Sequence, residues 1–476
     1  MSILGKKIIG ATIFYSIGEI VPRILSFLLL PVLTHHLSTR DYGITSYTNT
    51  IMSFVFVVAA LSLNTFVLRN YYLEKSEEGK RTLIGTIFLF ICLFNLVLFA
   101  LEMSFFPIAI HYFNIKIPFY PFFLLASINN FFDVISIIPL VVYRIKENPK
   151  GFVLLSLSRV VLQAFLTFIF VVMMNKGVLG SYLARFYINI PFAFIYIYVI
   201  YKNGYFVIRW DKIKEALTFS IPLLPASVSF LIISVSDRVI LERYISLNEL
   251  GIYSVAFTLS LALNIIVQAL YRTFEQIIFK RFHDLDFNQL NLKLYKIFSV
   301  LVLTGGFSIA LISQEIFKII ASRGFYEGHQ LVPYMVVYVV IAGFNTYLST
   351  LLVAANRQKI ISLLTGISAV MCIVLNLILV PSLGYWGSII ATIISVSIIT
   401  VICCIKLNIF SSLQYYQILS LVLIVIVPVY LNFHPVFLNM YLNLLIKMVI
   451  LITFLTASLF ILKIPFLEKL KLLKSS

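Results

Sequence analysis

Charged residues are scarce in this sequence: they make up 12% of its 476 residues, whereas hydrophobic residues make up 61%. Ordinary soluble domains are about half apolar and about a quarter charged. A soluble fold of this composition would leave much apolar surface in water, so the composition excludes an ordinary soluble protein. The apolar runs are continuous rather than alternating, which disfavours a membrane β-barrel. The chain is therefore predicted to be an all-α integral membrane protein.

The sequence also lacks several signatures of catalysis and processing. Its four cysteines fall inside apolar runs without metal or redox spacing, which is typical of small packing residues. There is no P-loop, which argues against direct use of ATP, and no cofactor is predicted. The first apolar run, 8–33, is too long for the core of a signal peptide and has no small-residue cleavage site.

Fourteen apolar runs are long enough to span a bilayer as helices, which takes about 20 residues each. Their approximate ranges are 8–33, 44–68, 82–106, 118–143, 152–174, 179–201, 218–242, 251–278, 294–320, 331–355, 360–381, 387–407, 415–432 and 441–462. The longest polar connections are 202–215 and 280–293. No connection is large enough to fold as a separate domain.

Lysine and arginine are concentrated in every second loop, and this bias sets the orientation of a membrane protein. With a cytoplasmic N-terminus, the outer set is small: Arg40, Lys116, Lys176, Arg243, Lys318, Arg323 and Lys447. Both termini are therefore predicted to be cytoplasmic. The net charge of +17 follows from the same bias. Because this charge is spread over many loops rather than gathered in one domain, nucleic-acid binding is disfavoured.

Two short phrases each occur twice in the chain. LSTRDYGITS (37–46) is echoed by ISLNELGIYS (245–254), 208 residues later, and GVLGSYLA (177–184) by GYWGSIIA (384–391), 207 residues later. Glycine in such turns supplies backbone angles that other residues resist. Glycine, serine and alanine are common in membrane helices anyway, but two nearly equal offsets at equivalent turns favour a duplication.

The duplication predicts the domain organisation. Its period is six spans, an even number, so the two copies enter the membrane from the same side as parallel repeats. The predicted parts are an N-terminal six-helix lobe at 1–201, a cytoplasmic linker at 202–217, a C-terminal six-helix lobe at 218–407, and helices 13 and 14 with a basic cytoplasmic tail at 408–476. Two such lobes around a central cavity are typical of a transporter.

Buried charge is the best sequence clue to what the cavity holds. Five arginines lie within predicted spans, and each would cost about 3 kcal/mol if it faced lipid at a helix centre. They are Arg23, Arg159, Arg185, Arg238 and Arg272. Guanidinium groups favour phosphate because they are planar, multidentate donors that keep their charge. The five are predicted to line a cationic cavity for an anionic cargo, although Arg238 and Arg272 are close enough to span ends to snorkel.

The first and fourth spans also carry acids near mid-membrane. Glu19 and Arg23 are four residues apart, so they pair on one helical face, either as part of the cavity or as a neutralised structural pair. Pro22 cannot donate to the Gly18 carbonyl, which predicts a kink that is either a hinge or fixed. Glu19 and Asp133 are candidates for coupling to H⁺ or Na⁺, since a carboxylate at this depth can titrate or bind a cation.

The run SDRVILERYISLNELGIYSVAFTLSLAL (236–263) resembles the seventh-to-eighth-helix signature of Wzx-like polysaccharide-repeat flippases, members of the multidrug/oligosaccharidyl-lipid/polysaccharide (MOP) exporter superfamily. The matching positions are Asp237, Arg238, Tyr244, Glu249, Gly251, Ile252, Tyr253 and Ser254. The phrase at 37–46 is similar to the first outer turn of the same family through Asp41, Tyr42 and Gly43. With fourteen spans and duplicated halves, the likeness covers essentially the whole chain.

The resemblance implies a V-shaped pair of six-helix bundles in the bacterial inner membrane. Its implied cargo is an undecaprenyl-diphosphate-linked oligosaccharide, flipped by alternating access for O-antigen or capsule synthesis. Its implied partners are this lipid-linked substrate, membrane lipids and other polysaccharide-assembly proteins, with a groove for the lipid tail at 415–462.

Three alternatives stay open. A multidrug exporter of the same superfamily would carry acids rather than arginines in its cavity. A membrane glycan polymerase or ligase would need a substantial outer loop. A flippase for peptidoglycan precursor would share the diphosphate chemistry.

Overall fold

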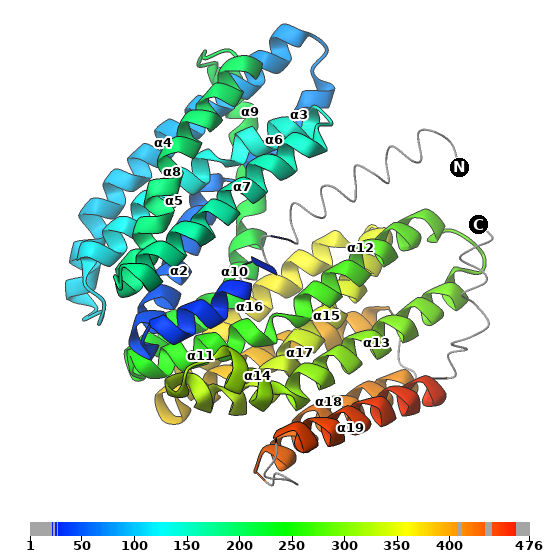
Figure 1. The fold of residues 1–476 in the computed structure, drawn as a ribbon. Helices are drawn as coiled ribbons and strands as arrows, with labels where there is room; N and C mark the ends of the chain where they lie inside the picture. Colours follow the sequence, from blue (N-terminus) through cyan, green and yellow to red (C-terminus); the bar gives the residue numbers. More distant parts are fainter. Residues whose placement is uncertain (1–20, 22–23, 26, 408–411, 434–439, 463–476) are drawn as a thin grey trace. The chain divides into compact units, whose positions relative to one another are not determined.

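The computed structural model describes residues 21, 24–25, 27–407, 412–433 and 440–462, and the regular elements in these ranges are all helical (Figure 1). Thirteen helical segments there are long and apolar enough to cross a membrane, and a short apolar helix, Phe27–His36, precedes them. The predicted all-α membrane class is therefore confirmed. Most of the first predicted span, 8–33, lies outside the described residues.

The chain forms two compact units, Met1–Gly251 and Ile252–Ser476. The first unit contains α2 (Thr39–Ala60), α3 (Leu63–Leu73), α4 (Glu77–Tyr112), η1 (Phe119–Phe123), α5 (Leu124–Ile135), α6 (Ile137–Ile145), α7 (Pro149–Thr167), η2 (Phe168–Met173), α8 (Gly177–Asn203), α9 (Trp210–Ser220), η3 (Ile221–Leu223) and α10 (Leu224–Tyr244).

Helix α11 (Leu247–Ser260) begins in the first unit and ends in the second. The second unit continues with α12 (Leu263–Arg281), α13 (Phe287–Leu311), α14 (Ser313–Ile320), η4 (Arg323–Gln330), α15 (Val332–Ala354), α16 (Gln358–Leu383), α17 (Tyr385–Lys406), α18 (Ser412–Phe433) and α19 (Met440–Ile461).

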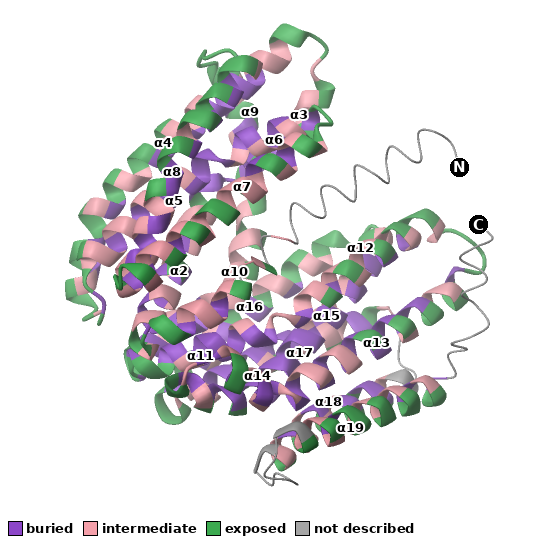
Figure 2. Ribbon diagram, in the orientation of Figure 1, coloured by how far each residue is buried: buried purple, intermediate pink, exposed green. Residues whose placement is uncertain are grey.

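Helices α5 and α8 are central to the first unit. Helix α8 packs against α4, α5, α6 and α7, and α5 also packs against α2 and α4. The core between these helices is apolar and includes the fully buried side chains of Phe66, Ile87, Ile138 and Ile200. The outward faces of α4, α7 and α8 carry exposed residues in Figure 2. Exposed apolar side chains on such helices suit a lipid environment.

Helix α15 is the centre of the second unit, where 72% of its most apolar stretch is buried (Figure 2). It packs against α12, α13, α16, α17 and α18. Aromatic rings of Phe298 on α13 and of Phe344 and Tyr347 on α15 pack together, with centroids 5.2–6.3 Å apart between the helices. A buried polar contact joins α18 to α13, since Gln417 Nε2 donates to Ser299 Oγ over 2.8 Å.

Several predicted spans are divided into separate helices in the structure, among them the eighth, which is divided between α11 and α12. The second span is interrupted between α2 and α3, where Leu61 and Ser62 take positive φ angles of 47° and 53°. The fourth breaks at Ser136, between α5 and α6. The ninth ends at Leu311, and α14 follows as a separate short helix. Single-span hydropathy cannot detect such breaks, because the residues on both sides are equally apolar.

The predicted linker at 202–217 is partly helical. Helix α9 begins at Trp210 and is followed directly by η3, which contains Pro222, and then by α10. The seventh spanning segment therefore runs from Trp210 to Tyr244. Its start was placed too late because the charges between 211 and 215 resemble those of a loop, although they occupy one turn of an amphipathic helix.

Lys447 does not belong to a loop, which corrects its assignment to the predicted outer set. It lies within α19 and is buried, and its Nζ donates to both carboxylate oxygens of Glu315 on α14, over 2.9 and 2.8 Å. A lysine inside an apolar helix needs such a partner because a lone buried charge is costly. The sequence showed the lysine but not the carboxylate that neutralises it.

The glycines of the second echoed phrase have equivalent local geometry in the two units. Gly177 and Gly384 both take a positive φ, 53° and 56° respectively, and each stands at the start of a helix. A Cβ on Gly180 would come within 3.0 Å of the preceding backbone, and one on Gly387 within 2.4 Å of the Leu379 oxygen. Each copy thus uses its first glycine for the turn angle and its second for a close backbone approach.

Candidate functional site

The first unit contains a cavity of about 700 Å³ whose wall combines charged, polar and apolar side chains. Its lining comes from α2, α5, α7, α8 and α10, with Ser136 from the break between α5 and α6. The lining residues are Asn49, Met52, Ser53, Phe56, Val57, Asn130, Asp133, Ser136, Arg159, Gln163, Arg185 and Leu231. A cavity of this size within a bundle of spanning helices is a candidate site for a polar cargo.

Asp133 joins two of the predicted arginines at this cavity. Its Oδ1 accepts from Arg159 Nη2 and its Oδ2 accepts from Arg185 Nη2. The three residues come from three helices, α5, α7 and α8. The Asp133 and Arg159 side chains are 11% and 17% exposed, whereas Arg185 is 35% exposed. Arg185 is therefore the guanidinium more open to a solute.

A chain of buried amides holds Arg159 in place. Arg159 Nη2 also donates to Asn189 Oδ1 over 2.7 Å, and Asn189 Nδ2 donates to Asn129 Oδ1 over 3.2 Å. Asn129 Nδ2 in turn donates to the Tyr182 carbonyl over 3.1 Å. Because Asn129 and Asn189 are buried and each makes two of these bonds, the network fixes the guanidinium relative to α5 and α8.

The break after α5 adjoins the same carboxylate. Ser136 ends α5, and its Oγ donates to the Asp133 carbonyl over 2.6 Å. Side-chain bonds of this kind replace a backbone partner where a helix is interrupted. The interruption lies one turn from the Asp133 side chain, so the helix break and the site carboxylate are on the same helix.

The site has more positive charge and more donors than its protein partners satisfy. The described lining residues include two arginines and one aspartate as ionised groups. Within the described part of the chain, Arg159 Nε and Asn130 Nδ2 are buried without a hydrogen-bond partner. Buried polar atoms of this kind need an explanation, because nearly all such groups in proteins are satisfied. A cargo that accepts hydrogen bonds and carries negative charge would satisfy both deficits.

Arg238 and Arg272 are not among the described residues that line this cavity. Arg238 on α10 is buried beside its chain neighbour: its Nη1 donates to Asp237 Oδ1 over 2.8 Å and to the Ser234 carbonyl over 3.3 Å. Arg272 lies on α12 in the second unit and is half-buried. The remaining predicted residues, Gly18, Glu19, Pro22 and Arg23, lie outside the described residues.

The amides of the site were not singled out by the sequence reasoning, although a signal exists. Asn129 precedes Asp133 by four residues on α5, and Arg185 precedes Asn189 by four on α8. Residues four apart share a helical face. Polar pairs at this spacing in otherwise apolar spans therefore mark the two faces that meet at the site.

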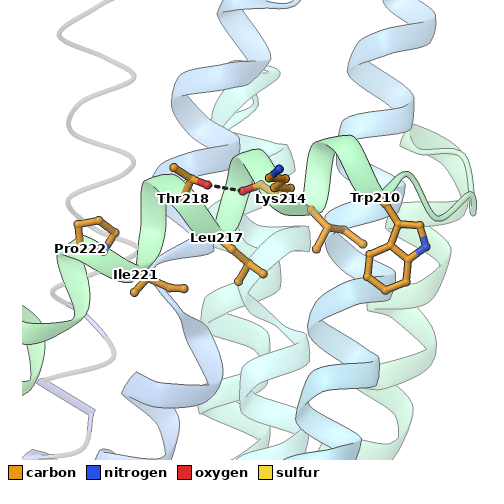
Figure 3. Close-up of a pocket in the computed structure, with 7 residues that line it drawn as sticks. Trp210, Lys214, Leu217, Thr218, Ile221 and Pro222 are labelled. Atoms are coloured by element: carbon orange, nitrogen blue, oxygen red, sulfur yellow. Dashed lines mark hydrogen bonds between the residues drawn. The ribbon is translucent and has the colours of Figure 1, made fainter.

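Two further cavities are lined by α9 and share Lys214 and Thr218, and their walls differ from that of the arginine cavity. One, of about 440 Å³, is lined by side chains from α9 and η3, with Trp210, Leu217 and Ile221 along the helix and Lys214 as the charged residue among its described lining (Figure 3). The other, of about 580 Å³, contacts α3 through Phe66, Arg69 and Asn70. Trp210 is 74% exposed, so the first of these is an open surface groove rather than an enclosed site.

The fold defines the class of protein, a multi-pass, all-helical membrane protein. The structure is similar to a lipid II flippase, MurJ, in an inward closed conformation, with a TM-score of 0.70 and 18% identity over 94% of this chain and 98% of that one. It is also similar to a multidrug resistance MATE family transporter in an inward-facing conformation, with a TM-score of 0.61 and 13% identity over 84% of this chain and 98% of that one.

Residues 9–277 match the polysaccharide biosynthesis protein family, and the chain belongs to that family. A relative from Haemophilus influenzae, Lsg locus protein 1, is 22% identical to this chain over 274 residues, which are 56% of this chain and 64% of the relative. The match therefore spans a little less than two thirds of that protein. The resemblance drawn from the two outer turns is confirmed at the level of the family.

Proposed function

We propose that this protein is a flippase that moves undecaprenyl-diphosphate-linked oligosaccharide repeat units across the bacterial inner membrane for O-antigen or capsule synthesis. The observation that carries the proposal is the pair Arg159 and Arg185, which share the single carboxylate of Asp133 beside a cavity. A guanidinium has five N–H donors. The two guanidinium groups together offer far more N–H donors than one carboxylate can use, so the cluster can bind an additional anion.

A diphosphate matches this cluster in charge and geometry. Its oxygens compete with the Asp133 carboxylate for the same guanidinium edges, since a tetrahedral phosphate, like a carboxylate, can accept two parallel N–H bonds through two of its oxygens. Arg185 is the more exposed cation and would meet the diphosphate first, whereas Arg159 is fixed by Asn189. The cavity wall also carries neutral polar side chains, which suit sugar hydroxyl groups: Asn49, Ser53 and Gln163.

Asp133 is also the proposed coupling residue. Protonation would remove its negative charge and release both guanidinium groups to the cargo, whereas the ionised form holds them. This favours H⁺ over Na⁺ as the coupling ion, because both carboxylate oxygens are occupied by arginine. Three further parts of the proposal rest on the sequence alone. They are Glu19 as a second coupling residue, Arg23 as a cavity residue, and Gly18 with Pro22 as a hinge.

The proposed setting is the bacterial cytoplasmic membrane with both termini inside, and the proposed partners are the lipid-linked substrate, membrane lipids and other polysaccharide-assembly proteins. A cation exporter is disfavoured because the cavity has an excess of guanidinium over carboxylate. The polymerase or ligase alternative needs a long folded loop. The connections between the described helices from Thr39 to Lys406 are short turns (Figure 1).

The test is complementation of a strain that lacks this gene. We expect the deletion to abolish a surface polysaccharide and to leave its lipid-linked unit in the cytoplasmic leaflet. The wild-type gene restores export, and the double variant R159A/R185A does not, at equal protein level. R209A is the matched control, because Arg209 is 58% exposed and pairs with Asp211 outside the cavity.

Three outcomes would contradict the proposal. Normal export by R159A/R185A would remove the role of the cluster. Growth arrest with accumulated peptidoglycan precursor would identify the other diphosphate cargo. Raised sensitivity to cationic drugs with intact surface polysaccharide would support the multidrug alternative.

A further inference from the structure

Helix α4 carries a buried glutamate outside the arginine cluster. Glu102 lies in the spanning segment Glu77–Tyr112, ten residues before its end, which is about 15 Å along a helix. It is 8% exposed, and it shares the inward face of α4 with the buried residues Asn95, Phe106 and Ala109. An ionisable side chain inside a spanning helix is costly, so its presence there calls for a functional explanation.

The Glu102 carboxyl group has no counter-charge in the described part of the chain. Its Oε2 atom is buried there without a hydrogen-bond partner. By contrast, the buried carboxylates of Asp133 and Glu315 bind cations, two arginines and a lysine respectively. A lone carboxylate in a dry protein interior is less stable than the neutral acid, because burial removes its hydration without replacing it. The surroundings of Glu102 therefore favour the protonated form.

The charged groups on neighbouring elements lie away from Glu102. Helix α4 packs against α2, α3, α5, α6, α8, α9 and η1. The ends of α3, α6 and α9 adjoin the start of α4, where Tyr72 donates to the Ile145 carbonyl and Lys212 pairs with Glu74 (Figure 1). The other packed elements carry five ionised side chains, Arg40, Asp41, Asp133, Arg185 and Lys202. Among the described residues, none of these groups has an electrostatic effect on Glu102, which interacts instead with the Ser127 hydroxyl.

A polar face of α5 leads from Glu102 to the arginine cavity. The Ser127 hydroxyl, which interacts with the Glu102 carboxyl group, also lies 3.9 Å from Met52 Sδ at the cavity wall. Ser127, Asn130 and Asp133 follow one another at intervals of three residues, so they share one face over about 9 Å. Asn130 and Asp133 line the cavity, and Asn130 Nδ2 is buried without a partner among the described residues. This face offers the polar partners through which water can carry a proton between Glu102 and the cavity.

We propose that Glu102 is a second proton-binding group, which holds a proton in this conformation and exchanges it with water in the cavity along α5. The inference rests on the proposed function for its role, namely coupling of H⁺ to transport together with Asp133. The reaction is a proton transfer alone: cavity water gives a proton to the carboxylate, and the O–H bond so formed breaks when the proton returns to water. While α4 and α5 stay packed, the dry site retains the proton. Entry of water between them stabilises the carboxylate and releases the proton.

The first test asks whether Glu102 holds a proton that the unfolded chain gives up. Glu102→Gln keeps the size of the side chain and removes its titration, and thermal unfolding of the purified full chain is measured at several pH values. A glutamate in an unfolded chain ionises near pH 4.3. Above that pH the wild type holds a proton that its unfolded form releases, so its stability falls, whereas E102Q loses no stability for this reason. We expect the Tm difference to shift in favour of E102Q as the pH rises from about 5 to about 8.

Glu78→Gln is the matched control, because Glu78 is an exposed glutamate near the start of the same helix. An exposed carboxylate is ionised in both the folded and the unfolded chain over this pH range, so E78Q should show no such gain. If the Tm values of E102Q and the wild type differ by a constant amount, Glu102 holds no extra proton and the proposal is overturned. This readout needs no cargo, so it separates failure of the inference from failure of the proposed function.

The second test asks whether this proton takes part in transport. Strains that lack the chromosomal gene and carry the wild type, E102Q or E102D are compared for surface polysaccharide, at equal protein level, over a range of medium pH. We expect E102Q to export several-fold less than the wild type and to lose the response to pH, because an amide cannot exchange a proton in this way. Glu102→Asp keeps a carboxyl group and should retain the response. Export by E102Q with the wild-type pH response would show that Glu102 is only a structural acid and would refute the proposal.

Discussion

Replacing Asp133 by asparagine tests whether the carboxylate stabilises the fold by holding two cations. The change keeps the size of the side chain and removes its charge, so the two guanidinium groups lose their shared counterion. Arg159 keeps its bond to Asn189, whereas Arg185 loses its bond to Asp133. The perturbation is therefore concentrated on electrostatics rather than packing.

The expected magnitude follows from burial. Breaking a fully buried ion pair by removing one partner costs about 3–5 kcal/mol. Arg159, at 17% exposure, lies near that regime. Arg185 is 35% exposed, and an ion pair so open to water contributes at most about 1 kcal/mol. We expect D133N to lower the free energy of unfolding by about 3 kcal/mol.

The assay is thermal unfolding of the purified protein, followed by cysteine reactivity or tryptophan fluorescence, with and without inorganic pyrophosphate. D211N is the control: it removes the carboxylate of the exposed Arg209–Asp211 pair and should unfold like the wild type. Pyrophosphate should stabilise D133N more than the wild type, because a ligand that binds only the folded state raises its stability. If D133N and D211N unfold alike and pyrophosphate affects neither, the shared-counterion reasoning is wrong.

Two further predictions concern positions outside the cavity. K447M should lower the free energy of unfolding by about 3–5 kcal/mol, because it leaves Glu315 buried and charged. The double variant E315Q/K447M should recover most of that loss in the same unfolding assay. A double variant as unstable as K447M would contradict this prediction. G85A should lower the free energy of unfolding by about 1–3 kcal/mol through overpacking, since its Cβ would lie 1.7 Å from the Tyr205 oxygen. G366A is the control and should be neutral or slightly stabilising, because its Cβ would meet no atom within 4 Å. Equal effects of the two alanines would show that the backbone contact is unimportant.

Composition and periodicity determined the class of the fold from the sequence. A run of about 20 consecutive apolar residues is long enough to cross a bilayer as a helix, so the helical class and the approximate positions of the thirteen spans in the described residues followed. The breaks within the spans did not follow. Leu61 and Ser62 take left-handed angles inside an apolar run, where neither residue type favours them, so the run itself does not predict the break.

The candidate site could be predicted only in part. The sequence showed that Asp133, Arg159 and Arg185 lie at membrane depth, where an unpaired charge is costly. The sequence gave no reason to expect that these three residues pair with one another, whereas Arg238 pairs with Asp237. Partner choice depends on how each helix is rotated about its axis and which helix packs beside it, and neither is encoded in the spacing along a single helix.

The duplicated phrases show the same division. Their nearly equal offsets, read from the sequence alone, predicted that Gly43 and Gly251 are equivalent positions in two copies of one unit. That these two glycines are also each other's partners was decided by the tertiary structure, which brings two helix starts 208 residues apart into backbone contact. The physical reason is that a glycine marks where a close approach is allowed, whereas the identity of the approaching segment is set by the packing of whole helices.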